Sequence, residues 1–157
     1  AAIASYGNPA VTQWIGDKSL DTTVAAVQAR LKRYCDRTTA FPGLGCWAVL
    51  SQQTVVGTVL LMPLPNRENA PSGKVEIGWH FRPESCGQGY ATVAAQALMT
   101  YGFETRQLPE IYAVTLLDNN RSVKVTQRLG MTDLGISHDY YGGHELRLFW
   151  RQAPAES

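Results

Sequence analysis

The sequence lacks any apolar run long enough to cross a membrane, and no signal peptide is visible at its start. It is also poor in charge: Asp, Glu, Lys and Arg make up 17% of the residues, and the formal net charge at pH 7 is +1. This balance gives no reason to expect nucleic acid or a membrane surface as a partner. The chain shows no internal repeat, and its 157 residues suit a single domain, 1–157, with one buried core.

Cysteine is scarce as well. Cys35, Cys46 and Cys86 cannot all pair with one another, and their spacing is not that of metal ligands. We therefore predict free thiols, as in a reducing cytoplasm, and no metal requirement.

A glycine-rich turn at residues 84–91, Glu-Ser-Cys-Gly-Gln-Gly-Tyr-Ala, is the most informative stretch of the chain. Before it, apolar residues at every second position of 75–81 predict a strand with one buried face. After it, apolar residues recur at helical spacing from Tyr90 onward, so the turn leads into a helix N-terminus whose first N–H groups lack internal partners. Gly87 and Gly89 allow positive φ and leave room above the backbone, which suits a pyrophosphate.

Two other phosphate-binding turns fit less well. A Walker loop ends in Gly-Lys-Ser/Thr, but Gln88, Gly89 and Tyr90 stand here. A dinucleotide fingerprint needs a third glycine where this chain has Thr92. Both folds also place a uniformly apolar parallel strand before the turn, whereas residues 75–81 alternate.

The turn resembles the acyl-CoA loop of the GNAT superfamily of N-acetyltransferases, whose pattern is Gln/Arg-x-x-Gly-x-Gly/Ala; Glu84 stands at the first position here. Downstream, a predicted strand at 111–116 precedes residues 118–122, Asp-Asn-Asn-Arg-Ser, which are similar to the family's Asp-Asn-x-x-Ser segment. Residues 128–131, Arg-Leu-Gly-Met, are similar to its Lys/Arg-Leu-Gly-Phe/Met. The order and spacing of the three motifs resemble the RimJ/RimL-like subfamily of ribosomal-protein-alanine N-acetyltransferases.

The resemblance implies a GNAT-like α/β (α+β) fold, with a mixed, mostly antiparallel central sheet, helices on both faces and one β-helix-β acyl-CoA-binding crossover. The remaining patterns favour a hairpin of strands 46–50 and 55–62 and two late strands at 132–137 and 145–150. Residues 63–73, with three prolines, predict a surface loop. The chain begins at Ala1 without a methionine, and we expect the family's N-terminal strand to be absent from it or replaced.

An amphipathic helix is predicted at residues 21–36, with Ser19 or Asp21 as its cap. Its apolar positions are Leu20, Val24, Val27, Leu31 and Tyr34. Its cations are Arg30, Lys32, Arg33 and Arg37, which we interpret as a solvated face, although the corresponding helix of the family borders the acceptor groove.

The resemblance implies acetyl-CoA as cosubstrate, with the pantetheine inserted where the strands before and after the loop splay apart. Backbone groups near Trp79 would pair with the cofactor, the loop amides would hold its pyrophosphate, and Asn119 would bond the pantetheine. The residues expected to bind the cofactor are Trp79, His80, Phe81, Cys86, Gly87, Gln88, Gly89, Tyr90, Ala91, Asn119 and Ser122.

The family's usual general acid is a tyrosine, and Thr126 stands at its position here. Ser122 is then the nearest hydroxyl to the departing sulfur, or simply a serine that favours a helix start. Glu76 is the first candidate for the base, or else an ordinary glutamate on a half-exposed strand. His80 is expected on the same strand face as Glu76 and titrates near neutral pH.

The last hairpin carries four residues that could shape the acceptor site or serve only the turn: His138, Tyr140, Tyr141 and His144. Two functions stay open. The first is an acetyl-CoA-dependent N-acetyltransferase acting on a primary amine, either a peptide N-terminal α-amine or a small molecule, as a monomer or homodimer. The second is a non-catalytic acyl-CoA-binding module of the same fold.

Overall fold

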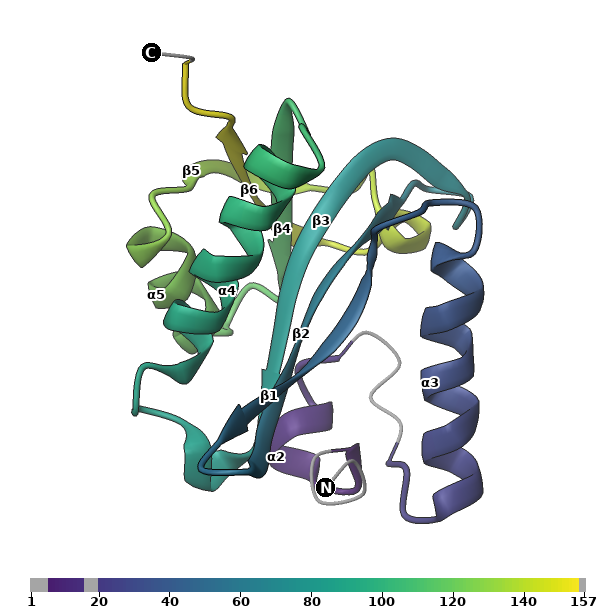
Figure 1. The fold of residues 1–157 in the computed structure, drawn as a ribbon. Helices are drawn as coiled ribbons and strands as arrows, with labels where there is room; N and C mark the ends of the chain where they lie inside the picture. The colour runs from purple at the N-terminus through teal and green to yellow at the C-terminus, as the bar shows by residue number, and fades with distance from the viewer. Residues whose placement is uncertain (1–5, 16–19, 156–157) are drawn as a thin grey trace.

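The computed structural model describes residues 6–15 and 20–155, and in them one six-stranded sheet runs through the molecule (Figure 1). Its strand order is β1-β2-β3-β4-β6-β5, and only the β3–β4 pair is parallel. The strands are β1 Gly45–Ser51, β2 Thr54–Pro65, β3 Pro71–Phe81, β4 Glu110–Thr115, β5 Thr132–Ser137 and β6 Leu146–Gln152.

Helices cover both faces of the sheet. Figure 1 shows α4 and α5 on one face and α3 on the other. The α-helices are α2 Pro9–Thr12, α3 Val24–Thr38, α4 Tyr90–Thr100 and α5 Asn120–Arg128, and the shorter turns are η1 Pro83–Ser85, η2 Tyr101–Thr105 and η3 Tyr141–Gly143. The mixed sheet, the two helical layers and the β3-α4-β4 crossover confirm the predicted fold class.

The main core lies where α4 and α5 pack on the sheet, around Leu61, Ile77, Met99, Ile111 and Phe149. A smaller cluster contains Leu64, Tyr112, Tyr140 and Leu148. Because side chains alternate along a strand, Ile77 of β3 enters the main core while Glu76 points to the face covered by α3.

The predicted surface loop at residues 63–73 is wrong. β2 continues to Pro65 and β3 begins at Pro71, so only residues 66–70 form the turn. Proline can sit in a strand wherever its missing N–H is not needed for pairing, and Leu64 between two prolines is fully buried. Asn66 closes the turn: its Oδ1 accepts from the N–H groups of Glu68 and Ala70, at 2.9 and 3.0 Å.

The α3 prediction needs two corrections. The helix begins at Val24 and is capped by Thr23, whose Oγ1 accepts from the Ala26 N–H at 3.1 Å; Ser19 lies outside the described residues. Asp21 is not the cap, because it is buried in an ion pair with Arg30. The helix also packs through a different face, since Val27 and Arg30 are buried. The predicted apolar positions left exposed are Leu20, Val24 and Leu31.

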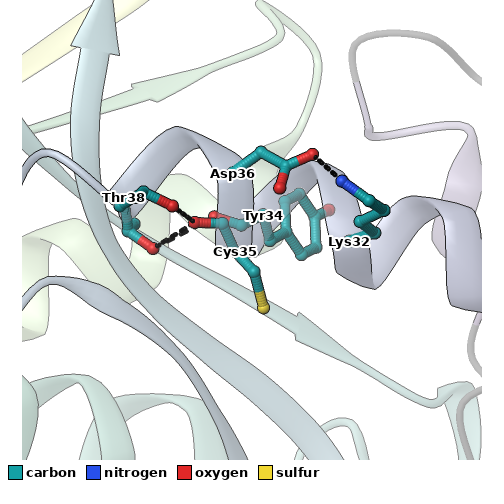
Figure 2. A network of polar contacts seen from close by, with 6 residues as sticks. Lys32, Tyr34, Cys35, Asp36 and Thr38 are labelled. Atoms are coloured by element: carbon teal, nitrogen blue, oxygen red, sulfur yellow. Dashed lines mark hydrogen bonds and ion pairs between the residues drawn. The ribbon is translucent and has the colours of Figure 1, made fainter.

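Figure 2 shows the last turns of α3. Thr38 Oγ1 donates to the Cys35 carbonyl at 3.0 Å, and exposed Lys32 pairs with Asp36 at 2.6 Å. Lys32 therefore has the solvated role predicted for it, and the hydroxyl contacts satisfy a carbonyl that the helix end leaves without an N–H partner.

Cys35, Cys46 and Cys86 are free thiols, as predicted. In residues 6–15 and 20–44 no strand precedes β1, and Tyr6 and Val11 of this N-terminal part are buried. Among the helices described, none combines the length and apolarity that a membrane span requires.

Candidate active site

The cavity of interest opens where β3 and β4 part. β3 pairs with β2 along its whole C-terminal half, up to Phe81, but pairs with β4 only near Glu76 and Tyr112. In the part of the chain that the structure describes, the backbone of β3 from Gly78 to Phe81 therefore has no strand on its β4 side. A cavity of about 870 Å³ lies there, lined on the β4 side by Thr115, whose buried Oγ1 has no partner among the described residues.

The glycine-rich turn reaches this cavity through Cys86, and its other residues do not line the cavity. Gly87 and Gly89 both have φ of +79°, and Gly89 is the N-cap of α4, which begins at Tyr90. Apart from the glycines themselves and the residues next to them in the chain, no described atom lies within 4 Å of the position that a Cβ on either glycine would take, so the space over the loop is open. Cys86 lines the cavity, with its Sγ 3.4 Å from the Arg82 carbonyl. The predicted turn into a helix N-terminus is confirmed.

Asn119 and Ser122 reach the same cavity from the start of α5. Asn119 is buried, and its Oδ1 accepts from the Ser122 N–H at 3.3 Å. The amide oxygen is thus engaged as a helix cap, and the Nδ2 group is the part of the side chain that is left for a ligand.

Glu76 is buried on the other side of the opening, with 4% of the residue exposed. Tyr141 donates its hydroxyl to Oε1 of Glu76, and Arg37 Nη2 lies 3.4 Å from the same oxygen. The alternative of an ordinary half-exposed strand glutamate is therefore wrong. The physical reason is that α3 and the β5–β6 turn both cover this face of β3.

Burial raises the pKa of the Glu76 carboxyl to about 7, while the Tyr141 hydrogen bond and the charge of Arg37 act in the opposite direction. A carboxyl group that titrates near neutral pH can accept a proton from an amine and later release it.

The prediction of a solvated face on α3 is wrong for Arg37 and for Arg30. Arg37 donates from Nη2 to the Pro63 carbonyl at 3.0 Å as well as to Glu76, so it is not part of a solvated face. Arg30 is buried beside Asp21, while Arg33 is exposed as predicted. The sequence signal that was missed is a row of four residues on α3, spaced three, four and three positions apart. The row consists of Val27, Arg30, Tyr34 and Arg37.

A sequence model described as the Acetyltransferase (GNAT) domain matches residues 1–132 of the chain. The chain belongs to this family.

Two curated proteins illustrate the similarity of this GNAT domain. It is 34% identical over 106 residues to the FsC-acetyl coenzyme A-N(2)-transacetylase of Aspergillus fumigatus, a match that covers 66% of the chain and 45% of that protein. It is 24% identical over 145 residues to the uncharacterized N-acetyltransferase YoaA of Bacillus subtilis, covering 89% of the chain and 77% of that protein. The chain thus spans less than half the length of the first.

Among solved structures, the GNAT domain resembles RimL, the ribosomal L7/L12 α-N-protein acetyltransferase, in complex with coenzyme A. The TM-score is 0.74 at 17% identity, and the match covers 92% of this chain and 81% of that chain. At this identity the likeness shows a shared fold.

The position of the usual GNAT tyrosine offers no acid in this chain. Thr126 is fully buried, and its hydroxyl donates to the Val123 carbonyl at 2.7 Å. Ser122 lines the cavity and Thr126 does not, so the structure leaves the Ser122 hypothesis standing.

The other predicted site residues divide into two groups. Trp79, His80, Phe81, Tyr141 and His144 line the cavity. His80 packs edge-on against Tyr6, with ring centroids 5.9 Å apart. By contrast, Tyr140 is buried in the smaller cluster and accepts from Lys74 Nζ at 2.8 Å, and the His138 carbonyl accepts from Arg67 at 2.9 Å. Of the loop residues, Gln88 donates its side-chain amide to the Glu84 carbonyl at 3.0 Å and Ala91 packs against the main core.

Replacing Asn119 with Ser tests the pantetheine contact separately from the helix cap. Serine keeps a side-chain oxygen that can cap α5 but loses the longer amide donor. We expect the melting temperature to stay close to that of the parent protein and the dissociation constant for CoA to rise about fivefold, the effect of one lost hydrogen bond. Calorimetric titration measures the affinity; unchanged affinity would make Asn119 a cap only.

Proposed function

We propose that this GNAT domain transfers the acetyl group of acetyl-CoA to a primary amine by direct attack in a ternary complex. One observation supports the proposal above all: the buried carboxyl of Glu76 lines the same cavity as the stretch of β3 that has parted from β4 and the loop residue Cys86. A thioester held along that stretch and an amine beside Glu76 would meet inside about 870 Å³.

The loop and the strand β3 have separate proposed roles in binding the cofactor. The loop amides of Gly87, Gln88, Gly89, Tyr90 and Ala91, at the positive end of α4, hold the pyrophosphate. The backbone of Trp79, His80 and Phe81, on the side of β3 where β4 has parted from it, pairs with the pantetheine, and one N–H there polarises the acetyl carbonyl.

In the reaction the amine nitrogen bonds to the acetyl carbonyl carbon, and the bond from that carbon to sulfur breaks. Glu76 takes the proton that the amine loses, which a carboxyl with a pKa of about 7 can do at neutral pH. The thiolate of CoA takes up a proton from solvent or through Ser122, the hydroxyl at the start of α5. No metal takes part in this scheme.

The charges of the side chains that line the cavity limit the kinds of amine that suit it as acceptor. The described residues that line it include Arg33, Arg37 and Arg121, with Glu76 as the one carboxylate among them, while the charge of Arg30, which also lines it, is offset by buried Asp21. Such a lining suits the phosphates of CoA and disfavours a polycationic acceptor such as a polyamine or an aminoglycoside. A peptide N-terminus or a singly charged small amine fits it better, and the structural likeness to an α-N-protein acetyltransferase points the same way.

We predict that a peptide carrying both kinds of amine is acetylated on its N-terminal α-amine. Deprotonation of a lysine with a pKa of about 10.4 costs roughly 4.6 kcal/mol at pH 7, whereas an α-amine near about 7.8 costs about 1. One carboxyl base can meet the smaller demand. Mass mapping of the acetylated peptide gives the answer, and modification chiefly on lysine would contradict it.

Two further proposals concern the cellular compartment of the protein and its oligomeric state. Three free thiols agree with a reducing cytoplasm, which we propose as the compartment, and we propose a monomer or homodimer.

A coupled assay separates the enzyme from its alternative, a non-catalytic acyl-CoA-binding module. With acetyl-CoA and a panel of peptides, amino acids, polyamines and aminoglycosides, the enzyme releases free CoA thiol only when an accepted amine is present. A module that only binds acyl-CoA releases none with any amine, although CoA still raises its melting temperature.

A further inference from the structure

Glu76 is held by two side chains from two distant parts of the chain, and both act on the same oxygen. Arg37 comes from the end of α3 and Tyr141 from the turn between β5 and β6, and each contacts Oε1. Oε2 accepts no hydrogen bond from any residue in the described ranges. We propose that Arg37 and Tyr141 are positioning residues that fix Glu76 through Oε1. Oε2 is then left to take the proton from the acceptor amine, a step that rests on the proposed function.

The backbone at Tyr141 supports a role beyond turn formation. Tyr141 has φ of +50°, a left-handed conformation that is uncommon for residues other than glycine, and Gly142 follows with φ of +73°. Residues in such conformations persist where their surroundings hold them and are frequent at functional sites. Here the conformation brings the Tyr141 hydroxyl onto the carboxyl of Glu76, 65 positions earlier in the chain.

The turn between β2 and β3 holds this conformation in place. Gly142 donates its N–H to the Asn66 carbonyl at 3.2 Å, and Asn66 also forms an isolated β-bridge with Tyr140. Arg67 adds a hydrogen bond to the His138 carbonyl at 2.9 Å. Tyr141 is thus anchored on both sides along the chain, so its hydroxyl has little freedom to leave Glu76.

Arg37 is fixed in a similar way. Its Nη2 lies between the Pro63 carbonyl, at 3.0 Å, and Glu76 Oε1, at 3.4 Å, so the guanidinium joins α3 to β2 and β3. The residue precedes Thr38 in the last turn of α3 that Figure 2 shows. A cation on one oxygen and a hydroxyl on the same oxygen stabilise the ionised carboxyl without covering the second oxygen.

No further charged or titratable group acts on Glu76 from the elements around it. Arg37 of α3 and Tyr141 of the β5–β6 turn are the two that do so within the described chain. The neighbouring strands place Met62 of β2 and Tyr112 of β4 beside it in register, and the hydrogen bonds to its carboxyl come from neither.

The test is a carbon-13 NMR titration of the Glu76 carboxyl in the whole chain, which needs no catalytic activity. Loss of a donor to an ionised carboxylate should raise the pKa of Glu76 by about one pH unit or more in Tyr141→Phe. The control, Tyr140→Phe, removes the neighbouring hydroxyl, which bonds Lys74 instead, and should leave that pKa where it is. An unchanged pKa in Tyr141→Phe would overturn the proposal.

Arg37 is tested by Arg37→Gln and Arg37→Lys. The glutamine variant should raise the pKa of Glu76, and the lysine variant, which restores the charge, should bring it part of the way back. If both titrate like the parent protein, Arg37 does not position Glu76. A variant whose circular dichroism spectrum departs from that of the parent protein is replaced by Arg37→Met.

Kinetics separate this inference from the proposed function. In a protein that acetylates amines, the acidic limb of the pH–rate profile should move to higher pH in Tyr141→Phe by the same amount as the NMR pKa, and Tyr140→Phe should leave it in place. If no amine is acetylated but the NMR pKa moves as expected, the proposed function is refuted, and the positioning of Glu76 by Arg37 and Tyr141 stands. A rate loss in Tyr141→Phe that is equal at every pH would refute the positioning of Glu76 by Tyr141, and the proposed function would stand.

Discussion

Glu76→Gln is expected to slow acetyl transfer at pH 7.5 by about 100-fold or more, the usual contribution of a general base, while the affinity for acetyl-CoA stays unchanged. The reason is geometric as well as chemical. Glutamine keeps the shape of the side chain and can still accept from Tyr141 and Arg37, but it cannot take a proton from the amine.

The measurement is the initial rate of thiol release as a function of pH. The rate of the parent protein should rise with pH through about 7, as the Glu76 carboxyl loses its proton, and this limb should be missing from Glu76→Gln. Glu110→Gln is the matched control, because Glu110 accepts from Trp150 Nε1 at 2.8 Å and does not line the cavity. Equal rates for Glu76→Gln and the parent protein would contradict the assignment of the base.

The same substitution should change the dependence of stability on pH. The folded state raises the pKa of Glu76 from an ordinary 4.5 to about 7, so it binds a proton more tightly than the unfolded chain does. The resulting stabilisation is fully present below about pH 4.5 and is lost as pH rises to about 7. Between pH 5 and pH 8 the parent protein should therefore lose melting temperature relative to Glu76→Gln.

Gly89→Val is expected to abolish the stabilisation that CoA gives. At about 100 times its dissociation constant CoA should stabilise the parent protein by roughly 2.7 kcal/mol, seen as a rise in melting temperature. A β-branched side chain at Gly89 would enter the open space that we propose for the pyrophosphate and would strain a backbone with φ of +79°.

Gly73→Val is the control for the strain alone. Gly73 also has a positive φ, of +83°, and open space at its Cβ position, but it lies in β3 and not in the loop before α4. This variant should lose stability as Gly89→Val does and keep the full response to CoA. A full response in Gly89→Val would refute the loop assignment, and a larger response of the parent protein to ATP or NAD than to CoA would refute the ligand.

The features that could be predicted from the sequence are those that depend on neighbours along the chain. Gly87 and Gly89 before a helix pattern gave the loop, and the motif at 118–122 gave the start of α5, because turns and caps are set by a few consecutive residues. The alternation around Ile77 gave the strand and the face that it buries in the main core.

The features that were missed depend on contacts between distant residues. An arginine on a helix normally favours solvent, and the burial of Arg30 depends on partners such as Asp21, with which it forms an ion pair, and the ring of Tyr6. The burial of Glu76 follows from Arg37 and Tyr141, which lie 39 positions before it and 65 after it. Its raised pKa could not be read from the strand itself, since the burial that raises it comes from α3 and the β5–β6 turn, which cover this face of β3.

Acetylation of a defined peptide tests the central claim most directly. The whole chain is mixed with acetyl-CoA and a peptide with a free N-terminus and one internal lysine, and the peptide mass and the released thiol are followed together. The account predicts one acetyl group on the α-amine for each thiol released, with the rate increasing with pH through about 7. Release of thiol without an acetylated amine, or a bound CoA with no product from any amine, would contradict it.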